Sequence, residues 1–132
     1  MMQLKCLFTL YWAALFFFFA PGNGLTVNPF PDSVGAQELI SGKVPDPAVN
    51  VYVIVNPVET PQQYWVQKKA SVDNKRNWTT TVHFGDPGSA HQHQQFKLMV
   101  VADPQLNLHE SDVLSDWPNA RWRSEIFTVV RK

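Results

Sequence analysis

VNVYVIV, residues 49–55, is the clearest strand pattern in the chain. Side chains alternate between the two faces of an extended segment, so every second residue of this stretch lies on the same face. One of these faces carries only β-branched side chains, which favour strands: Val49, Val51, Val53 and Val55. We expect this valine face to lie in the core of a β-sheet protein.

The segments on either side show the same period of two, and ten prolines and six glycines separate them at short intervals. The further expected strands are residues 25–30, 36–44, 64–67, 76–84, 95–102 and 122–130. About seven short strands favour an all-β fold, a two-layer antiparallel β-sandwich, and a small barrel also fits the count. Trp78 shares one face of its expected strand with Thr80, Val82 and Phe84, and it is the expected buried aromatic centre.

Two connections stand out between these strands. Gly85-Asp86-Pro87-Gly88 carries turn-forming residues and predicts a hairpin turn. Residues 103–118 lose the period of two but keep several leucines and a tryptophan. We expect a long connection or a short helix there, with its apolar side folded back onto the domain.

The first 24 residues have the order of a secretory signal peptide: Lys5, the apolar run 6–20, then Pro21-Gly22-Asn23-Gly24. We expect cleavage after Gly22 or Gly24, which leaves residues 25–132 as a single domain in a secreted, periplasmic or cell-envelope location. Retention as an anchor is the alternative. The apolar run would span about 22 Å as a helix, short of the ~30 Å hydrocarbon core of a bilayer.

The composition limits the classes of partner that the chain is expected to bind. The chain is 45% hydrophobic and 17% charged, which is typical of a globular protein. Cleavage would remove Lys5 and the only cysteine, Cys6, so the remaining domain would be nearly neutral and would have no disulfide. A balanced charge gives no electrostatic basis for binding nucleic acid, and a membrane is an expected partner only if the signal segment is uncleaved.

The order of five segments carries a resemblance to a known kind of domain. They are ISGKV at 40–44, VYVIVNP at 51–57, YWVQ at 64–67, NWTTTVHFG at 77–85 and FKLMVVA at 96–102. This order resembles an immunoglobulin-like module of bacterial exported and envelope proteins, over residues 36–131. The resemblance implies an immunoglobulin-like sandwich with a binding or spacing role and implies no catalytic residues. Most such modules accompany other domains, and we expect a single domain here. The resemblance therefore also implies a separate partner protein or surface.

Aromatic side chains are the candidate binding surface. Exposed aromatic rings on a sandwich stack on sugar rings or anchor protein interfaces. The candidates are Tyr64, Trp65, Trp117 and Trp122. Since Tyr64 and Trp65 are neighbours in an expected strand, they point to opposite faces. We expect Tyr64 or Trp117 to be the contact residue.

Three other sets of polar residues give weaker indications of metal binding, catalysis or glycosylation. His91 and His93, in an extended segment, would point to one side as two metal ligands, but two ligands do not make a site. Glu110, Asp112 and Asp116 offer the carboxylate pair of a glycoside hydrolase, and they equally suit a solvated turn. Asn77 begins an Asn-Trp-Thr glycosylation motif, within an expected strand.

We therefore predict an exported, non-enzymatic binding module that contacts a protein or cell-surface component. No catalytic, cofactor-binding or metal-binding residues are assigned, and no cofactor is expected. The first alternative is a carbohydrate-binding module that uses exposed aromatics, which would make a glycan the partner. The second is a small secreted hydrolase that uses an acidic pair.

Overall fold

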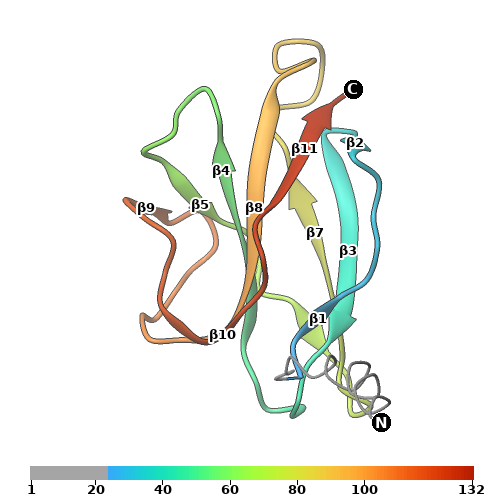
Figure 1. Cartoon of the computed structure of the whole chain (residues 1–132), viewed down its shortest axis with the longest axis vertical. Coiled ribbons are helices and arrows are strands. Elements are labelled where there is room, and N and C mark those ends of the chain that lie inside the picture. The colour runs from blue at the N-terminus through green and yellow to red at the C-terminus, as the bar shows by residue number, and fades with distance from the viewer. Residues whose placement is uncertain (1–23) are drawn as a thin grey trace, which may run out of the picture.

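Residues 24–132 form two β-sheets packed face to face in the computed structural model, which describes this part of the chain (Figure 1). The described residues include eleven strands and no helix. The predicted all-β sandwich is confirmed at this level. The expected signal peptide, except for Gly24, lies outside the described residues.

The smaller sheet has four strands in the order β1-β3-β7-β6. Its strands are β1 (Thr26–Val27), β3 (Gln37–Lys43), β7 (Asn77–His83) and β6 (Ser71–Val72). All pair antiparallel. β7 alternates buried and exposed residues, so this sheet has one core face and one wet face, as the sequence predicts.

The larger sheet has seven strands, in the order β2-β11-β8-β4-β5-β9, with β10 also paired to β8. Its strands are β2 (Ser33–Val34), β11 (Phe127–Arg131), β8 (Gln95–Pro104), β4 (Val51–Pro57), β5 (Tyr64–Val66), β9 (Val113–Leu114) and β10 (Ala120–Arg123). β2 pairs parallel with β11, and the other pairs are antiparallel. β5 and β9 extend this sheet to the left in Figure 1, away from β3 and β7.

The main core lies between the sheets. The valine face of β4 packs there, and Trp78 of β7 is fully buried in the same cluster, so both predictions are confirmed. Phe84 and Phe96 meet edge to face at 5.7 Å between ring centroids and link the two sheets. Apolar burial in such a core is the main favourable term in folding.

A smaller cluster covers the outer face of the larger sheet. Tyr52 and Ile54 of β4 pack there against Met99 and Leu108, which explains why β4 is buried on both faces. The Tyr52 hydroxyl donates a hydrogen bond to the Leu108 carbonyl at 3.1 Å. The connection after β8 therefore folds back onto the domain, as predicted, and it contains the short strand β9 where a helix was the alternative.

Three details of the prediction are wrong. Gly85 to Gly88 is no hairpin turn, because β7 and β8 belong to different sheets and residues 85–94 cross between them. The expected strand 122–130 is two strands, because Ser124 interrupts the pairing and its Oγ accepts the Val100 N–H. The count of about seven strands is too low, since two-residue strands such as β2, β6 and β9 are too short to show a period.

The turn between β6 and β7 is built on Asp73. Its Oδ1 accepts the backbone N–H groups of Lys75 and Asn77, both at 2.9 Å. The hydrogen bond from the Asn77 N–H is the main cause that lowers the pKa of Asp73 below its ordinary 3.8, and the Asn77 side chain, the Lys75 N–H and the Lys43 charge lower it further.

A carboxyl whose pKa is lower in the folded state contributes stability above its unfolded pKa and loses that contribution as the pH falls through the folded pKa. We therefore expect Asp73→Asn to be less stable than the wild type at neutral pH, with a difference that shrinks as the pH falls below 3.8. Urea unfolding at several pH values measures it. A difference that grows on acidification would contradict the assignment.

Candidate functional site

A groove opens at the side of the sandwich where the larger sheet extends past the smaller one. Its volume is about 590 Å³, and it is lined by residues from four segments: 55–67, 83–87, 91–96 and 110–111. This volume falls within the ~300–1,000 Å³ usual for ligand sites. We name it the Trp65 groove.

The groove exists because β6 is short. β6 pairs only with Trp78 and Thr79, and no further strand among residues 24–132 pairs with the rest of that edge of β7. The inner face of β5 is therefore left uncovered. Trp65 lies on that face with 37% of its surface exposed, while its neighbours Tyr64 and Val66 belong to the outer cluster.

One wall of the groove is the turn after β4, and a buried amide holds it. Asn56 is 4% exposed, and its Nδ2 donates to the carbonyls of Pro61 at 3.0 Å and Gln63 at 2.9 Å. Buried amides that meet their hydrogen-bonding partners fix local geometry, because leaving those partners unpaired is costly. Residues 57–63 therefore have a fixed path along the groove.

The opposite wall is the loop 85–94, and a buried arginine holds it. Arg131 is 4% exposed, and its Nη1 donates to the carbonyls of Phe84 at 2.8 Å and Asp86 at 3.0 Å, while Nη2 donates to Gly88 at 2.7 Å. Its backbone N–H and C=O pair with Gln94 and His93. The Nε is buried with no partner among the described residues. Arg131 thus holds the start of this wall with its side chain and the end with its backbone.

Gln67 lies at the base of the groove and is 8% exposed. Its Oε1 accepts the backbone N–H of His83 at 2.9 Å. A longer β6 would have paired with this part of β7 and supplied a backbone carbonyl instead. Within residues 24–132 the Gln67 Nε2 has no protein partner and is accessible to solvent, so it can donate a hydrogen bond to an occupant of the groove.

His91 lies against Gly85 on the loop wall. A Cβ at Gly85 would lie 2.5 Å from the His91 ring, and Gly85 has a φ of +80°, so only glycine suits this position. The His91 Nδ1 is 3.1 Å from Gln94 Oε1, and its Nε2 is 3.9 Å from the Asp86 carboxylate. These contacts hold the imidazole in the wall of the groove.

The predicted aromatic residues do not form one surface. Tyr64 and Trp117 pack edge to face at 4.8 Å on the outer face and are half-buried. Trp122 is half-buried against the main core, with the Arg121 guanidinium 4.4 Å from its ring centroid. Trp65 alone of the four lies in the groove.

The histidines and acidic residues that the sequence singled out lie in turns. His91 and His93 lie in a turn where His93 has a φ of +67°, so the expected extended segment is wrong. Asp112 accepts the His109 N–H and Asp116 the Trp117 N–H, as turn residues do. Of the three acidic residues, Glu110 lines the groove.

Sequence reasoning missed Asn56, Gln67 and Arg131. Arg131 had a signal, because it is two residues after Val129, and alternate residues of a strand share a face. Asn56 directly follows the valine-rich strand. No pattern in the sequence marks Gln67, whose role depends on where β6 ends.

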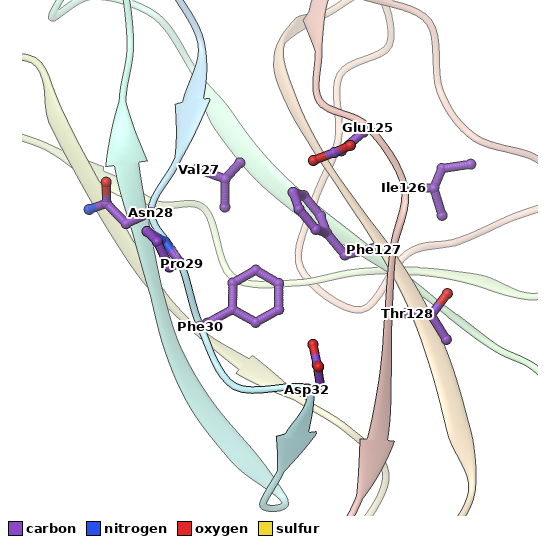
Figure 2. A pocket seen from close by; sticks show the side chains of 9 residues that line it. All are labelled: Val27, Asn28, Pro29, Phe30, Asp32, Glu125, Ile126, Phe127 and Thr128. Carbon is purple, nitrogen blue, oxygen red and sulfur yellow. The ribbon is translucent and has the colours of Figure 1, made fainter.

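A second groove, of about 470 Å³, lies between residues 27–32 and 125–128 (Figure 2). Phe30 and Phe127 meet there edge to face at 5.2 Å, and Figure 2 shows both rings between the two segments while Ile126 points away. The two phenyl rings therefore pack against each other and line this groove. Its polar side chains are exposed, so it offers less for recognition than the Trp65 groove.

In the described part of the chain, no three His, Cys, Asp or Glu side chains gather as metal ligands. No helix within residues 24–132 is long and apolar enough to cross a membrane. Comparisons with protein-family models, curated proteins and solved structures find no match to this chain.

Proposed function

We propose that the chain is an exported, non-enzymatic binding module that contacts a protein or cell-surface component through the Trp65 groove. The observation that carries this proposal is an exposed tryptophan in a groove whose two walls are fixed by buried polar side chains, Asn56 and Arg131. Tryptophan is enriched among residues that dominate binding energy, and a fixed groove loses little entropy when it is filled.

An immunoglobulin-like topology is part of the proposal. In that fold the sheets have the strand orders ABED and CFG. The order β1-β3-β7-β6 in one sheet and the run β4-β8-β11 in the other fit these orders. The first two strands are divided between the sheets: β1 pairs with β3 in the smaller sheet, and β2 pairs parallel with β11 in the larger one. This division also supports the proposed topology.

Export rests on the composition of residues 1–24, and we propose a secreted, periplasmic or cell-envelope location on that basis. The proposed relation to modules of bacterial exported proteins rests on the segment order given above. Both proposals place the groove where a partner outside the cytoplasm can reach it.

Carbohydrate binding is the second candidate. The Trp65 ring stands beside amides and carboxylates, a combination that also suits sugar rings. The residues that sequence analysis favoured for sugar stacking, Tyr64 and Trp117, use their rings against each other. The glycan proposal therefore also depends on Trp65.

Photo-crosslinking in cells that make the protein tests the proposed function. A photoreactive residue in place of Thr60, in the groove wall, should give discrete crosslinked species that disappear on Trp65→Ala. The matched control is the photoreactive residue in place of Leu39, which is 68% exposed on the other sheet and should give none of these species. Equal products from both positions, or products that persist with Trp65→Ala, would overturn the proposal.

A further inference from the structure

The Trp65 groove is rich in acidic side chains. Three carboxylates line it, those of Glu59, Asp86 and Glu110, and its lining within the described residues includes neither lysine nor arginine. Arg131 is buried, is not among the lining residues, and donates through Nη1 and Nη2 to backbone carbonyls of residues 84, 86 and 88. A cleft lined by charges of one sign attracts ligands of the opposite sign.

Trp65 gives this negative groove a flat ring with exposed surface. A cation placed over an indole face is attracted by the ring, and a guanidinium also stacks on it through its own plane. Carboxylates at the rim can then accept hydrogen bonds from the edge of the guanidinium. Ring and carboxylates together favour a basic side chain over a neutral or acidic one.

Gln67 adds a donor at the base. The residue is more than nine-tenths buried, and its Nε2 has no protein partner in the described chain but keeps access to the groove, so a carbonyl oxygen of an occupant can accept its hydrogen bond. A peptide offers both groups that the groove lacks: a main-chain carbonyl for Gln67 and a cationic side chain for Trp65 and the carboxylates.

We infer that the Trp65 groove binds a peptide segment of a partner protein through an arginine side chain. This inference rests on the proposed binding function and names its ligand class. The arginine stacks on Trp65 and pairs with Glu59 or Glu110, while a carbonyl of the peptide accepts the Gln67 Nε2–H.

The test is an NMR titration that follows the Trp65 indole N–H signal, assigned by its loss in Trp65→Ala. The full-length chain, purified in mild detergent, is titrated with the blocked tripeptide acetyl-Ala-Arg-Ala-amide and with its citrulline counterpart, which has nearly the same shape and no charge. We expect the arginine peptide to bind about fivefold more tightly or better.

Variants connect this preference to the groove. The double variant Glu59→Gln/Glu110→Gln should abolish the preference for arginine over citrulline. The matched control, Glu125→Gln, neutralises an exposed carboxylate at the other groove and should keep it. Equal binding of the two peptides to the wild type would overturn the inference, as would binding of cellotetraose without binding of the arginine peptide.

The two proposals fail differently. If groove crosslinks depend on Trp65 while arginine and citrulline peptides behave alike, the ligand class is wrong and the binding function stands. If the crosslinks do not depend on Trp65, the proposed function itself is wrong.

Discussion

Arg131→Met should lower the free energy of unfolding by about 3–5 kcal/mol, because three backbone carbonyls lose a charged donor and each such hydrogen bond contributes roughly 1.5–3 kcal/mol at most. Methionine fills much of the same space but donates no hydrogen bond. The carbonyls of Phe84, Asp86 and Gly88 would lose their donor, and the loss is most costly at the buried Phe84 carbonyl.

The same substitution should release the groove wall. Arg131 holds the loop 85–94 at Asp86 and Gly88, so the amide signals of this loop should broaden or shift while those of β3 stay unchanged. Denaturant unfolding and a two-dimensional NMR spectrum measure the two effects. Arg123→Met, at an exposed position on β10, is the matched control and should change stability little. A loss below about 1 kcal/mol for Arg131→Met would show that the arginine does not hold the wall.

Gly42→Ala should destabilise the protein by about 3 kcal/mol, at the upper end of the cost of overpacking. A Cβ at this position would lie 1.9 Å from the Thr26 carbonyl oxygen and 2.7 Å from Trp78 Nε1. Both atoms belong to one hydrogen bond, in which the Trp78 indole N–H donates to the Thr26 carbonyl at 3.1 Å. The methyl group would therefore force β1 away from β3 and leave the buried indole N–H without its acceptor.

Gly35→Ala is the matched control for that experiment. Its Cβ would meet its nearest neighbour, the Gln37 carbonyl oxygen, at an ordinary 3.6 Å. We expect its stability to stay near the wild-type value or to rise by up to about 1 kcal/mol, because alanine restricts the unfolded chain. Urea unfolding compares the two variants. Equal stability of the two would show that β1 does not approach β3 as closely as the structure has it.

The sequence predicts the long core strands of this fold better than the short strands at the edges of its sheets. The valine face of β4 and the burial of Trp78 follow from alternation within long strands, where several residues repeat the same signal. β2, β6 and β9 are two residues long and are defined by tertiary pairing, which a local pattern cannot show. The crossing at Gly85 carries turn residues that suit a hairpin and a sheet-to-sheet loop equally.

The site was less predictable for the same reason. Trp65 was among the candidate aromatics, but its exposure follows from the early end of β6, on a different segment of the chain. Tyr64 and Trp117 looked equally suited to binding, and their contact brings together residues from segments far apart in the sequence. Arg131 holds the loop 85–94 through contacts with residues far away in the sequence. Its role could be predicted only if the position of that loop were known, and no spacing in the sequence gives that position.

Hydroxyl-radical footprinting tests most directly whether the Trp65 groove is the contact surface. The full-length chain is oxidised in its native setting and again after purification, and the modification of each aromatic and leucine side chain is read by mass spectrometry. The account predicts that Trp65 is several-fold less modified in the native setting, while Leu39, on the other sheet, is modified equally in both. Protection of the Tyr64–Trp117 pair with Trp65 unchanged would contradict it.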